Sequence, residues 1–241
     1  MQHVYRSRLS KDVQTFVDEV EAAAGLAIEV VEDAALNSGG PAGQGKLKVD
    51  IEASRVQLFA PTNGYFPDGG VRHEALHVHR LHVDGVPRLA LAEDVDWDPD
   101  FERALVRVDN ALEHLIIVPI ELRYHPERKA HWEAVMARAW HEDLPAAPSA
   151  LDRRIGACLH GCLLRHVLPD SPAMDAAIAF MEAHDLRAEA ESFCDEAVLR
   201  LTDKLSVIQM FFDRFHEVSR TRAAVEYLNS RTGSQIRPIP V

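Results

Sequence analysis

Apolar and polar residues follow two different periods along the first part of the chain. From Ser10 to Ala24 the apolar residues recur every three or four positions, which predicts an amphipathic helix that Gly25 ends. Period-two alternation and short apolar runs then predict strands at residues 26–33, 47–51 and 56–60. The glycine-rich residues 37–45 predict a loop. These elements predict a small sheet with a helix beside it.

The remaining pattern is mainly helical. A helix is expected over residues 72–82, and a longer one begins near Phe101, with Pro119 predicted to kink or end it. From about Ser149 onward the pattern predicts helices up to about residue 230 and no strand. We therefore predict an α+β fold in which a mixed half, residues 1–145, is followed by an all-helical half, residues 146–241, packed against it.

Composition and charge exclude several classes of protein. The chain has 241 residues, of which 47% are hydrophobic and 27% charged, as in ordinary soluble globular proteins. A net charge of −12 disfavours nucleic acid as a partner, and no apolar run is long enough to cross a membrane. Three cysteines and a polar start without a signal peptide favour the cytoplasm.

The stretch "RHEALHVHRLH" contains the pattern His73-Glu74-x-x-His77. Residues four apart lie on one face of a helix, so both imidazoles can bind one metal ion while Glu74 lies beside them. Such a pair needs a third protein ligand and an open position for water, which is the usual arrangement of catalytic Zn²⁺. His79 and His82 leave this face. The pattern predicts a zinc site with Glu74 as general base.

The third ligand is expected in the next long helix, within "VDNALEHLIIVP". Glu113 and His114 stand there in apolar surroundings, where a charged group is costly unless it is paired or bound to metal. We predict Glu113 as the ligand. His114 is the alternative, either as ligand or as a group that orients a ligand, and Asp109 is a further candidate.

These residues resemble the zincin metallopeptidases, and among them the gluzincins, whose third ligand is a glutamate. The resemblance implies that His73, His77 and Glu113 bind zinc and that Glu74 is the base. It also implies that an edge strand near Val56–Ala60 holds a peptide substrate by strand addition. The stretch "DNALEHLIIVP" is also similar to the second helix of peptidases that cleave phage-type repressors, although the glutamate of that pattern falls at about Val106.

The expected function is that of a cytoplasmic zinc metallopeptidase acting on a peptide or protein. The alternative is a catalytically inactive zincin-like module that binds a protein, and the third hypothesis is a helical interaction protein in which the histidine pattern is accidental. Two other segments carry their own alternatives. Cys158, Cys162 and His166 share a helix face and are interpreted as core rather than metal ligands. The apolar run 208–215 is either core or a homo-oligomer face.

Overall fold

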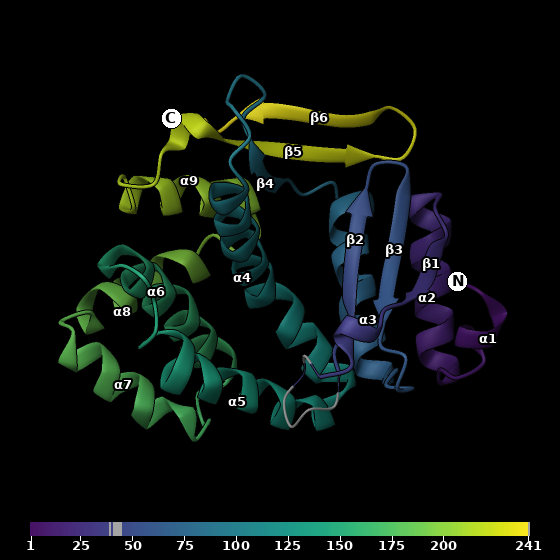
Figure 1. The fold of residues 1–241 in the computed structure, drawn as a ribbon, viewed down its shortest axis with the longest axis horizontal. Coiled ribbons are helices and arrows are strands. Elements are labelled where there is room, and N and C mark those ends of the chain that lie inside the picture. Colours follow the sequence, from purple (N-terminus) through teal and green to yellow (C-terminus); the bar gives the residue numbers. More distant parts are fainter. Residues whose placement is uncertain (39, 41–44, 241) are drawn as a thin grey trace. The chain divides into compact units, whose positions relative to one another are not determined.

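The computed structural model describes residues 1–38, 40 and 45–240 and has an α+β fold, as predicted. The helices are α1 His3–Arg6, α2 Lys11–Ala24, α3 Asp68–Val78, α4 Pro99–Tyr124, α5 Lys129–Arg138, α6 Ala150–Val167, α7 Ala173–Ala183, α8 Arg187–Val198 and α9 Lys204–Arg214 (Figure 1). The strands are β1 Ile28–Glu32, β2 Lys48–Glu52, β3 Arg55–Ala60, β4 Arg88–Leu91, β5 Ala223–Asn229 and β6 Gly233–Pro238. Part of the predicted loop 37–45, namely residues 39 and 41–44, lies outside the described residues.

The described residues form two compact units, each built from three separate segments of the chain. The first unit takes its residues from Met1–Arg88, Arg123–Pro126 and Glu226–Gln235, and the second from Leu89–Leu122, Glu127–Val225 and Ile236–Val241. The predicted division into halves at residue 145 is therefore not confirmed.

The first unit contains the predicted small sheet, in the order β1-β3-β2. Strand β1 is parallel to β3 and β2 is antiparallel to it. Alternate residues of a strand point to the same side, so the buried Val56, Leu58 and Ala60 all join the core that α2 and α3 complete. The helix predicted from Ser10 to Ala24 is confirmed, and Gly25 ends it with a φ of +69°.

The sheet order corrects one expectation. The strand near Val56–Ala60 was expected at the edge, but β3 is the central strand. Its hydrogen bonds are used on both sides, because β1 and β2 both pair with it. A peptide cannot be added to a strand that already has two neighbours. The edges of this sheet are β1 and β2.

The second unit is mainly helical, and α4 is its longest helix. Pro119 does not end this helix, which continues to Tyr124. Proline removes one helical hydrogen bond, but the residues around it are fixed by burial, since Ile117, Val118 and Glu121 are all inaccessible to solvent. The free cysteines Cys158, Cys162 and Cys194 are buried. The interpretation as core is confirmed for Cys158 and Cys162, whereas it is wrong for His166, which is exposed.

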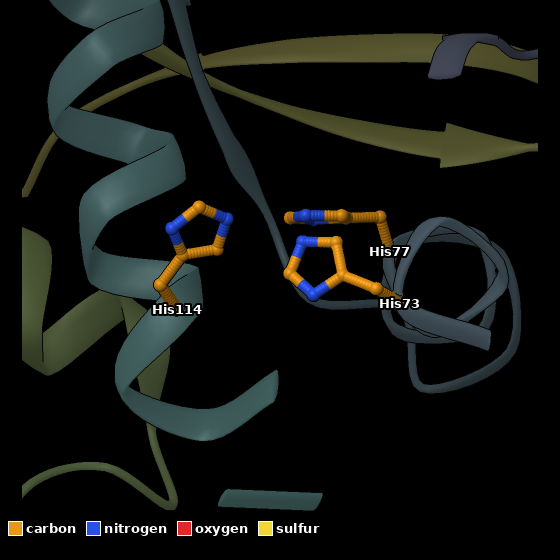
Figure 2. Close-up of side chains that lie close together, drawn as sticks. All are labelled: His73, His77 and His114. Carbon is orange, nitrogen blue, oxygen red and sulfur yellow. The ribbon is translucent and has the colours of Figure 1, made fainter. Parts of the chain in front are cut away.

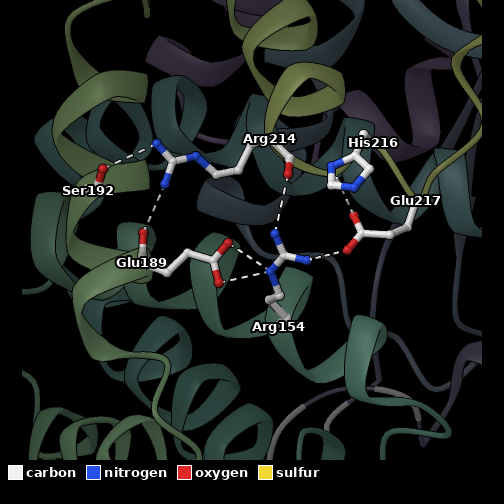
Figure 3. A network of polar contacts seen from close by, with 6 residues as sticks. All are labelled: Arg154, Glu189, Ser192, Arg214, His216 and Glu217. Atoms are coloured by element: carbon white, nitrogen blue, oxygen red, sulfur yellow. Dashed lines mark hydrogen bonds and ion pairs between the residues drawn. The ribbon is translucent and has the colours of Figure 1, made fainter.

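A polar network joins three helices of the second unit (Figure 3). Arg154 of α6 donates to the Glu189 carboxylate of α8 at 2.7 Å and to Glu217 at 2.6 Å. It also donates to the backbone carbonyl of Arg214 at the end of α9. The apolar run 208–215 is buried next to this network, since Ile208, Phe211 and Phe215 have no exposed surface. That run is therefore packed inside the chain.

The prediction of helices up to about residue 230 and no strand is wrong for this end of the chain, because Ala223–Asn229 and Gly233–Pro238 form the hairpin β5–β6. A third strand, β4, pairs with it in the order β4-β5-β6. Asn229 Oδ1 accepts hydrogen bonds from the N–H groups of Arg231 and Thr232, and Gly233 has a φ of +89°. This turn chemistry reverses the chain between β5 and β6.

Within the described part of the chain, no helix combines the length and the apolar character that crossing a membrane requires.

Candidate metal centre

The histidine pattern lies on α3, as the sequence predicts. The helix begins after Pro67, whose backbone is extended, and Asp68 stands in its first turn, where a negative charge is favourable. The Asp68 carboxylate accepts a hydrogen bond from the backbone N–H of Ser10, at 3.1 Å. Asp68 thereby joins the start of α3 to the start of α2.

His73 and His77 lie one turn apart on α3, and their ring centroids are 5.0 Å apart with the rings nearly perpendicular. His73 is buried. Glu74 follows His73 on the side of the helix that faces the sheet, where it lines a small hollow with Val49 of β2 and Leu58 of β3. The base candidate and the two imidazoles therefore come from the same helix, and the Glu74 side chain borders the sheet of the first unit.

His114 of α4 completes a group that could hold a metal ion. The ligand nitrogens of His73, His77 and His114 all lie within 4.8 Å of one another. Figure 2 shows the three imidazoles pointing toward one another, two from α3 and one from α4. Zinc–nitrogen bonds of about 2.0–2.1 Å separate the ligand nitrogens of a tetrahedral site by about 3.4 Å.

Glu113 is engaged elsewhere. Its Oε1 atom is 2.9 Å from Nζ of Lys204, and both side chains are buried. Asp109, the further candidate, lies 2.9 Å from the same ammonium and accepts a hydrogen bond from the backbone N–H of Leu89. Among the described residues neither carboxylate belongs to the metal-binding group. Adjacent residues of a helix point about 100° apart, which is why His114 and Glu113 have different surroundings.

The two other histidines of the motif have their own contacts. A π-helical turn follows α3 at His79–Val83. His79 Nδ1 lies 3.4 Å from an oxygen of Asp84, and a ring nitrogen of His82 lies 3.1 Å from the backbone carbonyl of Glu52. Burial lowers the pKa of His82, against the effect of that carbonyl. Both residues lie outside the three-histidine group.

Arg72, next to His73, fixes α3 within the first unit. Its guanidinium is buried between the rings of Phe16 and Tyr124, at 4.7 and 4.4 Å from their centroids. It also pairs with Asp12 and donates to Nε2 of His125 at 3.2 Å. These contacts join α3 to α2 and to the segment Arg123–Pro126, and so they set the rotation of α3 about its axis.

No local sequence pattern identifies Arg72, Lys204, Glu121 or Trp132 as contributors to this region. Arg72, Lys204 and Glu121 are charged residues in buried positions, and a buried charge points to a special role. Burial, however, is known only from the structure. Glu121 alone offered a hint, because it follows an apolar stretch of α4.

Comparisons of the chain with protein families, with curated proteins and with solved structures found no match. The functional interpretation therefore depends on the residues of α3 and α4 themselves.

Proposed function

We propose that this protein is a zinc-dependent hydrolase that cleaves a peptide bond, with His73, His77 and His114 as zinc ligands and Glu74 as general base. The observation that carries the proposal is the group of three imidazoles with ligand nitrogens within 4.8 Å of one another, in which one ligand directly precedes a glutamate. Three neutral imidazoles are a common ligand set for catalytic zinc. His114 replaces Glu113 in the proposed set because Lys204 holds the Glu113 carboxylate.

The chemistry divides between the metal and the chain. Bound zinc would supply a polarised water whose pKa is near neutrality. Glu74 is the residue that would accept a proton from the attacking water and deliver it to the departing amine. His73 and His77 would hold the metal from the same helix that carries Glu74, because the two histidines lie one turn apart on α3 and Glu74 directly follows the first. Their placement in a helix, rather than a loop, keeps base and metal aligned.

We place the peptide along β2 rather than β3. The outer edge of β1 is covered, since the Gln2 side chain bonds both the N–H and the carbonyl of Val30 and Glu21 accepts from the N–H of Ile28. Strand β2 is the other edge, and its Val49 borders the hollow that Glu74 lines. An extended peptide added to β2 would bring its backbone near the proposed base.

The metal site is tested by stoichiometry. The protein is loaded with zinc, dialysed against metal-free buffer and assayed for bound metal by mass spectrometry. We expect about one equivalent for the unmodified chain, a loss of at least tenfold in affinity for His77→Ala and His114→Ala, and retention by Glu113→Gln, the neighbouring control. The opposite order, with zinc lost by Glu113→Gln and kept by His114→Ala, would restore Glu113 as the ligand. Absence of zinc from the unmodified chain would leave the accidental pattern as the explanation.

The activity is tested with a peptide library. We expect the zinc-loaded protein to cleave a subset of peptides, and Glu74→Gln to bind zinc normally while the rate falls by roughly 10²–10⁴-fold, the usual contribution of a general base. Full turnover by Glu74→Gln would remove Glu74 from its role. Stoichiometric zinc with no cleavage of any peptide or protein would favour the inactive binding module.

A further inference from the structure

A fully buried carboxylate stands two helical turns after His114 on α4. Glu121 has no exposed surface. Its Oε1 atom accepts a hydrogen bond from Nε of Arg128 at 2.6 Å, and its Oε2 atom accepts one from the indole N–H of Trp132 at 2.8 Å. A carboxylate in the interior is costly unless such partners compensate its lost hydration. Glu121 therefore fixes the position of Trp132.

Trp132 in turn contacts the proposed ligand. Its ring centroid lies 4.9 Å from that of His114, and the planes meet at 73°. Edge-to-face contact of this kind is favourable at centroid distances of about 4.5–7 Å and depends on the relative orientation of the two rings. Trp132 is buried and its N–H is bound, so the indole cannot turn to follow the imidazole. The fixed indole therefore sets the orientation of the His114 ring.

All four residues belong to the second unit. His114 and Glu121 are seven residues apart on α4 and so lie on one stripe of the helix. Arg128 and Trp132 are four residues apart where α5 begins, which places them on one side of that helix. The sequence spacing on α4 and α5 thus brings Glu121, Trp132 and His114 close together.

We infer that Trp132, anchored by Glu121, is a positioning residue that fixes the imidazole plane of His114 for metal binding. A structural role alone does not account for the arrangement, because apolar packing of similar volume is often as stable as a buried ion pair. Fixing a ligand before the metal arrives lowers the loss of side-chain entropy on binding. The inference depends on the proposed metal site, and its test separates the two.

The first measurement is metal affinity, by competition of Zn²⁺ between the protein and a chromophoric chelator. We expect Trp132→Leu to weaken zinc binding about tenfold or more, as for other residues that support a ligand. Trp140→Leu is the matched control, because Trp140 is also buried in the second unit but packs on Phe180. Both variants should lower the stability of the metal-free protein. Equal zinc affinity in Trp132→Leu, Trp140→Leu and the unmodified chain would overturn the inference.

The second measurement needs no metal. The motional order of the His114 ring is determined by ¹³C relaxation in the metal-free protein. We expect a rigid ring in the unmodified chain and in Trp140→Leu, and a markedly more mobile ring in Trp132→Leu and Glu121→Leu. An equally rigid ring in all variants would refute the positioning role even if zinc binds. A mobile ring in Trp132→Leu together with no zinc binding by the unmodified chain would refute the metal site and support the positioning contact.

Discussion

At the scale of single residues, the buried ammonium of Lys204 pairs with two carboxylates, those of Asp109 and Glu113. Asp109 and Glu113 both lie 2.9 Å from it, so one positive charge faces two acids in the interior. Burial raises the pKa of Asp109, and the attraction of Lys204 opposes that rise. A buried ammonium without a carboxylate is strongly destabilising, which explains why Glu113 is drawn toward Lys204.

This cluster gives a prediction about stability and pH. A carboxyl whose pKa is raised by folding adds stability that is complete below its unfolded pKa and is lost as pH rises through the folded pKa. Lys204→Met removes the opposing attraction and raises the pKa of Asp109 further. We expect this variant to lose about 3–5 kcal/mol of unfolding free energy at pH 8 and clearly less at pH 5. Urea denaturation at both pH values measures it.

Asp109→Asn in the Lys204→Met background is the control for that prediction. The amide keeps an acceptor for the N–H of Leu89 but does not ionise. Its unfolding free energy should therefore depend less on pH than that of Lys204→Met alone. The same loss at pH 5 and pH 8 in Lys204→Met would contradict the role assigned to Asp109.

The sequence predicts some residues of the site and not others, for a physical reason. His73, Glu74 and His77 follow from local spacing, because helix geometry alone places them together. The choice between Glu113 and His114 does not, because both are apolar-flanked neighbours on α4. The two residues differ because Lys204 pairs with Glu113. Lys204 lies on α9, about ninety residues later in the chain, so no local sequence pattern predicts this contact.

At the scale of elements, α3 is held by Arg72 as much as by its apolar face. We expect Arg72→Met to lower the unfolding free energy of the metal-free protein by about 2–3 kcal/mol, since each cation–π contact contributes about 0.5–2 kcal/mol and the bond to His125 is lost. Arg55→Met is the control, because the Arg55 side chain is half exposed and pairs with Glu52 of the neighbouring strand β2. A change below about 0.5 kcal/mol in both variants would contradict the assigned role of Arg72.

The elements with strong local signals are the ones that the sequence predicts well. Helices α2 and α3 and strands β1, β2 and β3 agree with their apolar periods, and Ser10 and Gly25 set the limits of α2. The hairpin β5–β6 was missed because "AAVEYLN" begins with helix-favouring alanines directly after a helical stretch. The segment "NSRTG" contains Asn and Gly, which favour a turn, but the helix propensity of the preceding residues predicts a helix up to this point. Pairing with β4, which is distant in sequence, decides the outcome.

At the scale of the whole molecule, the chain passes repeatedly from one compact unit to the other. In addition to its long N-terminal segment, the first unit includes Arg123–Pro126, which are the last two residues of α4 and the two that follow, and Glu226–Gln235 of the β5–β6 hairpin. Periodicity along a chain cannot reveal such an exchange, because it reports only which face of an element is apolar. A single boundary, such as the one predicted at residue 145, therefore does not describe this molecule.

That interleaving has a consequence for how the protein is made. Domains that consist of one continuous segment fold in turn as they leave the ribosome. Here the unit that carries His73, Glu74 and His77 still lacks Glu226–Gln235 when its first eighty-eight residues have emerged. The helix with the histidine pair is thus synthesised early, but the unit around it becomes complete only when Glu226–Gln235 have been translated. By then almost all of the second unit has also been synthesised.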